Sequence, residues 1–175
     1  MASKGDIQAT RSANAAVATT TAEALDATET EIDLTSASGF PTGGGLVLIG
    51  SEVISYTGVS TNTLTGCVRG ANGTTAATHL TGVAASYLEQ IISPPVRLRA
   101  ISIASNAGGA GLVTLCSNDG VTLLTGDVPS GDVYTLNFPE DGILFPKGIY
   151  LKTSANVAAY TLFTDKYSGK GLTAN

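Results

Sequence analysis

Few residues of this chain could carry acid–base or nucleophilic chemistry. His79 is the single histidine, so a Ser-His-Asp or Cys-His arrangement would have to use it. It follows Ala76-Ala77-Thr78, and no nucleophile elbow lies nearby. No other soft ligand accompanies it, which argues against a metal site. We predict that His79 makes a structural hydrogen bond in a loop.

Two cysteines, Cys67 and Cys116, lie in different halves of the chain, and no CxxC pair exists. This usage predicts two small buried apolar side chains in a reducing compartment. Sequence alone leaves open whether the two are paired in a disulfide.

Carboxylates in the second half are the next candidates. Two of them at a suitable spacing could hydrolyse a glycosidic bond, and a cluster of oxygen ligands could hold calcium. Each lies beside Gly or Pro, where acidic residues commonly form turns, and there is no DxDxDG loop. We predict solvated turn residues at Asp119, Asp127, Asp132, Glu140 and Asp141.

A glycine-rich stretch at 106–111 resembles a phosphate-binding loop only superficially. Such a loop needs a helix start behind it, whose free N–H groups face the anion, whereas 112–115 reads as a strand. Of the nine basic residues only Arg97 and Arg99 lie close together, so the clustered basic footprint of a nucleic-acid-binding protein is missing. We predict no enzyme activity, no catalytic residue, no cofactor, no metal ligand and no nucleic-acid partner.

The elements that position these residues are short strands. From 39 to 79, apolar runs alternate with Gly, Asn and Ser clusters without a helical period, which is typical of strands joined by tight turns. Gly50-Ser51 suits a two-residue hairpin loop. We predict an all-β chain whose first module spans 29–89, with strands at 30–35, 46–49, 52–56, 63–68 and 84–88.

A second domain is predicted at 96–165, after a linker at 90–95 that Pro94-Pro95 stiffens. Its alternating runs and recurrent turn residues suggest an antiparallel β-sandwich or jelly roll. A polar tail follows at 166–175. The expected strands are 96–104, 112–117, 121–125, 133–138, 143–145, 149–153 and 158–164.

The first 28 residues are rich in Ala and Thr and poor in bulky apolar residues. Such a segment cannot offset its ordering entropy by burial, so residues 1–28 are predicted to form an extended arm that lies on a neighbouring subunit. An acidic run overlaps its end and either is merely solvated or meets a basic patch on a partner. This run comprises Glu23, Asp26, Glu29, Glu31 and Asp33.

Composition sets further bounds on the 175 residues. The formal net charge is −5, there is no Trp, and aromatic residues make up 6%, so the cores are thin and self-association would add stability. No apolar run approaches the ~20 residues of a membrane span. Residues 1–6 are charged with no apolar run behind them, so no signal peptide is expected.

The stretch from Gly39 to His79 resembles a motif common in tailed-phage virion proteins. The matching segments are Gly-Phe-Pro at 39–41, Leu-Ile-Gly-Ser-Glu-Val-Ile-Ser-Tyr-Thr-Gly at 48–58 and Arg-Gly-Ala-Asn-Gly-Thr at 69–74. The second half is also similar to small phage β-sandwich proteins, through 141–145, 148–151 and 160–163. The resemblance covers about a quarter of the chain through the motif, and no catalytic residue comes with it.

The resemblance implies a structural part of a virion, assembled in the bacterial cytoplasm. A capsid decoration (cement) protein, often a homotrimer, that binds the major capsid protein is expected first. A tail, baseplate or head–tail accessory that binds tail subunits is the alternative. A carbohydrate-binding module is a further class, for which the exposed-aromatic candidates are Tyr134, Tyr150, Tyr160 and Tyr167.

Overall fold

The computed structural model describes residues 7–12, 15–139 and 141–165. The chain divides into two compact units. Unit 1 comprises residues 1–15, 90–117 and 122–175, and unit 2 comprises 16–89 and 118–121. The chain passes from unit 2 to unit 1 between Glu89 and Gln90.

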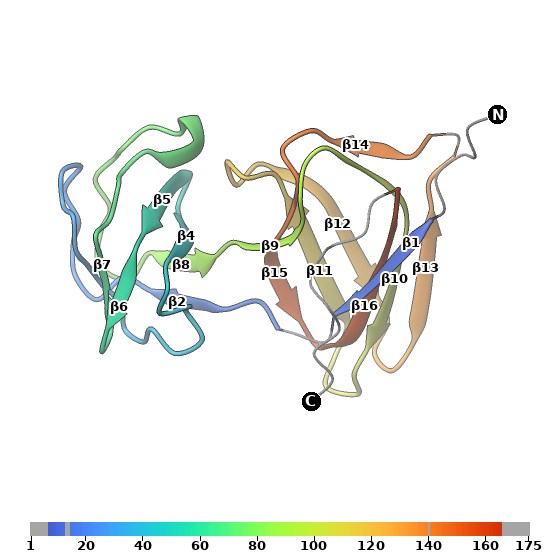
Figure 1. Cartoon of the computed structure of the whole chain (residues 1–175). Coiled ribbons are helices and arrows are strands. Elements are labelled where there is room, and N and C mark those ends of the chain that lie inside the picture. Colours follow the sequence, from blue (N-terminus) through green and yellow to red (C-terminus); the bar gives the residue numbers. More distant parts are fainter. Residues whose placement is uncertain (1–6, 13–14, 140, 166–175) are drawn as a thin grey trace. The chain divides into compact units, whose positions relative to one another are not determined.

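The fold is all-β, as predicted, and the described residues contain one short 3-10 turn, at Ala71–Gly73 (Figure 1). In unit 2 the strands are β2 (Ala18–Thr20), β3 (Ile32–Asp33), β4 (Gly45–Ile49), β5 (Glu52–Tyr56), β6 (Gly58–Ser60), β7 (Thr63–Thr65) and β8 (Ala84–Tyr87). In unit 1 they are β1 (Gln8–Ser12), β9 (Glu89–Ile92), β10 (Val96–Ser105), β11 (Gly111–Cys116), β12 (Thr122–Val128), β13 (Val133–Asn137), β14 (Ile143–Phe145), β15 (Ile149–Ala155) and β16 (Val157–Thr164).

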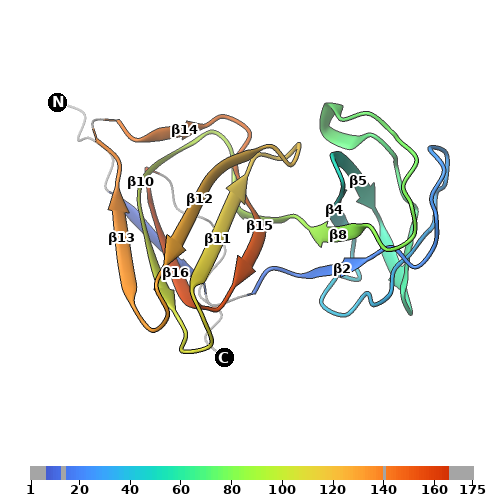
Figure 2. The ribbon, with the colours of Figure 1, turned by 180° about the vertical axis from the view of Figure 1, so that it is seen from behind.

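Unit 1 is an antiparallel sandwich of two sheets, which Figures 1 and 2 show from opposite sides. One sheet has the order β1-β16-β10-β13, with β14 also paired to β10, and the other has the order β12-β11-β15-β9. Strand β10 contacts both β11 and β12 of the opposite sheet. Strands β12 and β13, which a short turn connects, are therefore outer strands of the two packed sheets.

The alternation in β10 explains how the sandwich core forms. Leu98, Ile101 and Ile103 are buried, whereas Arg97 and Ser102 are only partly buried. An antiparallel sheet that packs on one face selects this pattern. The remaining core side chains come from the strands that oppose or flank β10. They include Val113, Leu115, Phe145, Leu151, Tyr160 and Leu162.

Unit 2 combines the sheet β2-β8-β4-β5 with the small sheet β3-β7-β6. The β4–β5 hairpin turns at Gly50-Ser51, as predicted, and Gly50 has the left-handed φ of 60° that such a turn needs. One apolar cluster fills the unit. It contains Leu25, Ile32, Leu34, Phe40, Val47, Ile49, Ile54, Tyr56, Leu64, Cys67 and Ala85.

The expectation of an extended arm over 1–28 is wrong for the part of this segment that the structure describes. Residues 8–12 form β1, which pairs with β16 of the same chain. Residues 18–20 form β2, which pairs with β8. Thr21 and Leu25 are buried in unit 2. Backbone ladders order this segment without the large apolar burial that the sequence argument required.

The predicted linker at 90–95 is also corrected in part. Strand β9 occupies 89–92 and belongs to the second sheet of the sandwich, with Ile91 and Ile92 buried. The prolines at 94–95 dominated the prediction, but they only separate β9 from β10. The polar tail at 166–175 lies outside the described residues.

Candidate functional site: a buried carboxylate, guanidinium and imidazole

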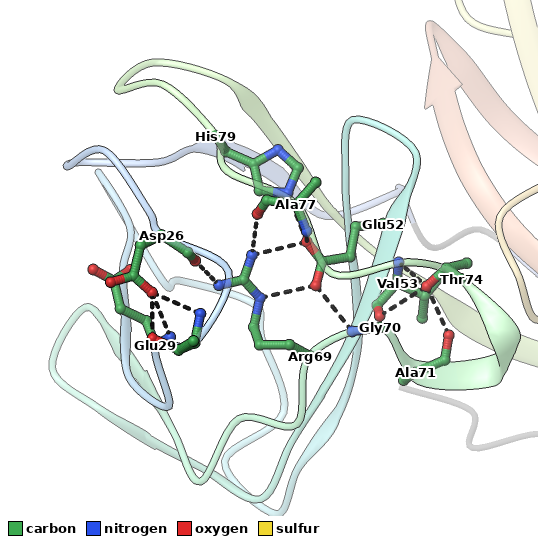
Figure 3. A network of polar contacts seen from close by, with 11 residues as sticks. Asp26, Glu29, Glu52, Val53, Arg69, Gly70, Ala71, Thr74, Ala77 and His79 are labelled. Atoms are coloured by element: carbon green, nitrogen blue, oxygen red, sulfur yellow. Dashed lines mark hydrogen bonds and ion pairs between the residues drawn. The ribbon is translucent and has the colours of Figure 1, made fainter.

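The most concentrated group of charged side chains within the described residues lies in unit 2, around Glu52 (Figure 3). Glu52 is the first residue of β5, directly after the hairpin turn, and only 1% of it is exposed. A carboxylate at this depth must find charged or hydrogen-bonding partners, because burial without them is costly.

The Glu52 carboxylate accepts hydrogen bonds from every side. Arg69 Nε donates to Oε1 and Arg69 Nη2 to Oε2, both at 2.8 Å. The backbone N–H of Gly70 donates to Oε1 at 2.9 Å, and that of Ala77 to Oε2 at 3.1 Å. His79 Nε2 lies 2.8 Å from Oε2. The carboxylate is therefore fully hydrogen-bonded by protein groups.

Arg69 extends the network to two further segments of the backbone. Its Nη2 donates to the carbonyl of Ala77 at 2.6 Å, and its Nη1 donates to the carbonyl of Asp26. The side chain is 6% exposed. A planar guanidinium suits this role because its donors diverge in fixed directions. One side chain thus fastens β5, the segment at 26 and the segment at 77 to each other.

Burial and hydrogen bonding shift the pKa of Glu52 in opposite directions. Burial alone would raise the pKa of its carboxyl group. The hydrogen bonds from Arg69, His79 and the two backbone N–H groups prevail and lower that pKa from 4.5 to about 2. The same hydrogen bond to Glu52 raises the pKa of Arg69. The pair is therefore ionised throughout the neutral range.

The loop that carries Arg69 is held in an unusual backbone conformation. Gly70 has φ 63°, and a Cβ placed there would lie 3.0 Å from the carbonyl oxygen of Thr74, so glycine is the residue that fits. Thr74 Oγ1 donates to the carbonyl of Ala71 and accepts from the N–H of Val53 in β5. The short 3-10 turn is thereby tied to the strand that carries Glu52.

The predicted role of His79 as a structural hydrogen-bonding residue is confirmed by its contact with Glu52. Sequence reasoning missed Glu52 and Arg69. The available signal was a single acidic residue inside an otherwise uncharged, strand-forming run at 45–56. A buried carboxylate there requires a cation from elsewhere in the chain, and sequence alone could not say which one.

The acidic run was predicted without a compensating base, but in the fold Arg69 lies beside it. Asp26 Oδ1 accepts from the N–H groups of Thr28 and Glu29 and from the Thr28 hydroxyl. These bonds, with the Thr28 hydroxyl first, lower the pKa of Asp26. Glu23 and Glu31 are exposed. The run therefore contains both a local turn and solvated side chains.

The carboxylates of the second half do not converge on a common site. Asp132 Oδ1 accepts from the N–H of Val133, and Asp141 contacts Arg99 at 3.4 Å. Asp119 lies in a turn, as predicted, whereas Asp127 lies within β12 rather than in a turn. Glu140 is outside the described residues. Within the described residues, no group of three or more His, Cys, Asp or Glu side chains is placed to hold a metal ion.

The remaining predicted features are placed as follows. Cys67 and Cys116 are both buried, as expected, and burial raises the pKa of Cys67 to about 11. The glycine-rich stretch at 106–111 leads into strand β11, so the described chain has no helix start there. Among the described residues, none of the helical segments is long and apolar enough to cross a membrane.

No protein-family model matches this chain, and no curated protein or solved structure was found similar to it. The site must therefore be interpreted from its own geometry. All the lone pairs and most of the donors of the Glu52 and Arg69 side chains are used within unit 2. This arrangement therefore holds three chain segments in place, namely β5 and the segments at 26 and 77.

Proposed function

We propose that this chain is a structural protein of a tailed-phage virion, and specifically a capsid decoration protein that binds the major capsid protein of the assembled head shell. The proposal includes self-association of the chain and assigns it no enzymatic activity. It assigns no catalytic residue, cofactor or metal.

Two things support the proposal together: the sequence resemblance and the geometry of unit 2. The stretch at 39–79 that resembles phage virion proteins contains Glu52, Arg69 and His79. Their polar groups bind one another and the backbone. The motif at 39–79 thus contains the residues that stabilise the module, and their charged groups are used within the module itself. This supports a role in which the chain contributes surfaces.

A decoration protein acts by mass action. It binds the assembled lattice better than the free subunits, so it stabilises the shell in proportion to its occupancy. Many copies on one particle give avidity without strong single contacts. A small two-unit β protein with thin cores suits such a role, because contacts with neighbours supplement its own limited core.

The test is to mix the purified, fluorescently labelled chain with DNA-filled heads that lack it and to image the particles. Binding over the whole shell, together with a higher temperature of DNA release, is the expected result. A matched control is the chain denatured and blocked at both cysteines, which should not bind. Absence of binding to heads would contradict the decoration role.

A tail, baseplate or head–tail accessory protein is the second candidate, because the motif at 39–79 also resembles modules of tail proteins. The same imaging experiment separates the two roles. Labelled copies confined to one vertex or to the tail would support the accessory role and exclude decoration of the shell.

The carbohydrate-binding alternative loses most of its candidate residues. Tyr150 and Tyr160 are 8% and 1% exposed, so neither can act as a stacking platform for a sugar. Tyr167 lies outside the described residues. Tyr134 is 52% exposed and is the one named tyrosine of the described part that a ligand could reach. A glycan-array screen tests this class directly.

A further inference from the structure

The outer strand β13 carries a surface that the proposed function leaves unassigned. It pairs with β10 in regular antiparallel register from Val133 to Asn137, without a bulge. Its sequence, Val-Tyr-Thr-Leu-Asn, has no charge, Gly or Pro. Natural sheets normally protect outer strands with charges, prolines, bulges or short length. Among the other outer strands longer than three residues, three carry a charge, at Arg11 (β1), Glu89 (β9) and Asp127 (β12). The one charged residue of β5, Glu52, is buried.

The hydrogen bonds at the two ends of β13 show which of its backbone groups face the open edge. The N–H of Phe138 donates to the carbonyl of Arg99, and the carbonyl of Asp132 accepts from the N–H of Ser105. Successive residues of an antiparallel strand direct their backbone groups to opposite sides. The N–H and C=O groups of 133, 135 and 137 therefore point away from β10. Of these, the N–H of Val133 donates to its neighbour Asp132 Oδ1, which would have to release it when a further strand pairs there.

The side chains at this edge are also exposed. Val133 is 62% and Tyr134 is 52% exposed. Tyr134 pairs with Ile103 and Leu136 with Ile101, so both lie on the face of the sheet that covers the core. Thr135 lies on the other face, where its hydroxyl donates to Ser102 Oγ at 3.0 Å. A strand added beside β13 would extend the face of the sheet that covers the core beyond Tyr134.

We propose that β13 pairs antiparallel with β13 of a second copy of this chain, about a two-fold axis at Thr135. The sequence is complementary to itself in this register. Thr135 lies opposite Thr135, Val133 opposite Asn137, and Tyr134 opposite Leu136. This is the register that pairs all three outward-facing residues with each other. Thr–Thr and aromatic–aliphatic neighbours are favourable cross-strand pairs, and no like charges are opposed.

The size of the contact sets the expected affinity. Five residues from each copy bury less than the ~800 Å² per partner of a standard stable interface. We therefore expect a reversible dimer whose population depends on concentration. This inference rests on the proposed self-association and makes it a two-fold dimer, in place of the homotrimer that the resemblance implies; its test uses the purified chain alone. Failure of the dimer would therefore leave binding to the particle as a separate question.

The first experiment is sedimentation equilibrium of the full chain across a range of concentrations. The wild type should show a monomer–dimer equilibrium. Thr135→Lys and Thr135→Glu each place like charges opposite one another at the axis and should weaken the dimer several-fold. An equimolar mixture of the two variants should restore a dimer. Ala9→Lys, on the opposite outer strand β1, adds the same charge and should leave the wild-type equilibrium unchanged.

A cross-linking experiment tests the register. In a hydrogen-bonded pair the Cα atoms are ~5.5 Å apart, within the range of a disulfide. Thr135→Cys should form an interchain disulfide under mild oxidation, and Val133→Cys should form one only when mixed with Asn137→Cys. A strictly monomeric wild type, a trimer, or dimers that Thr135→Lys does not weaken would overturn the proposal. So would cross-linking of Val133→Cys to itself in preference to Thr135→Cys.

Discussion

Arg69 and Glu52 meet through two parallel hydrogen bonds, in which Nε and Nη2 of the guanidinium donate to the two carboxylate oxygens at 2.8 Å each. Both side chains are almost completely buried. Seventeen positions separate them in the sequence, so the pair closes the segment that follows the β5 strand back onto the start of that strand. The ion pair therefore acts mainly by fixing the conformation of this part of unit 2.

Glu52→Gln tests this role. The substitution keeps the shape of the side chain but removes its charge, which leaves a buried guanidinium without its counter-ion. Breaking a buried pair in this way costs about 3 kcal/mol or more of unfolding free energy. Urea unfolding, together with hydrogen exchange of residues 69–79, measures the loss. Glu31→Gln, at an exposed position of the same unit, is the matched control and should change stability by less than about 0.5 kcal/mol.

The interpretation would fail if both variants had the same unfolding free energy, or if exchange in 69–79 were unaltered by Glu52→Gln. A loss confined to the amides of unit 1 would also contradict it, since the network lies in unit 2.

The lowered pKa of Glu52 predicts a specific dependence of stability on pH. The group has a pKa of about 2 in the folded chain, against an ordinary value of 4.5. Its contribution is therefore fully present above about pH 4.5 and is lost as the pH falls from there toward 2. The linked free energy is about 3 kcal/mol in total.

Urea midpoints measured between pH 7 and pH 2.5 give this dependence. The wild type should lose stability over the acidic part of the range more steeply than Glu52→Gln, because the variant lacks the titrating carboxyl group at position 52. Parallel curves for the two proteins would show that another carboxylate is responsible.

How much of this structure the sequence could predict depends on the kind of signal each element carries. Strand β10 was predicted to within a residue, because one buried face imposes an alternation on it, and β5 was predicted because it is a short apolar run directly after the Gly50-Ser51 turn. Strand β1 was missed because Gln8 to Ser12 buries little and is held through backbone pairing with β16. Backbone pairing leaves no pattern in side-chain hydrophobicity.

The candidate site divides in the same way. The structural role of His79 followed from the lack of any chemical partner near it in the sequence. Its actual partner, Glu52, was not predictable, because the two residues are 27 positions apart in the sequence and meet only in the folded chain. Local patterns specify strands and turns, whereas a buried ion pair depends on tertiary contacts that a single sequence does not display.

The buried thiols predict slow chemistry in the folded chain. Burial raises the pKa of Cys67 to about 11, so only about one molecule in a thousand carries the reactive thiolate at pH 8. Cys116 is buried as well. A disulfide-exchange reagent such as Ellman's should therefore detect almost no fast-reacting thiol in the native protein and two after unfolding in urea. One rapidly reacting equivalent in the native protein would contradict the burial of one of these side chains.

Deleting residues 1–12 tests whether the N-terminal segment belongs to its own sandwich. In the structure β1 covers the outer edge of β16, from Gln8 opposite Thr164 to Ser12 opposite Tyr160. Removing it leaves backbone groups of β16 without their partners. The expected cost is about 2 kcal/mol of unfolding free energy, because a few net hydrogen bonds of about 1 kcal/mol each are lost and some ordering entropy is recovered. The newly open strand should also promote aggregation.

The matched control is deletion of residues 1–6, which removes no strand that the structure describes. That variant should unfold like the full chain and keep the slow amide exchange of β16, whereas the longer deletion should accelerate exchange specifically at 160–164. If both deletions gave the same stability and the same exchange in β16, the segment would not contribute to its own sandwich. The original expectation of an arm directed to a neighbouring subunit would then regain its support. Because the two variants differ only by residues 7–12, the comparison isolates the contribution of the β1 segment.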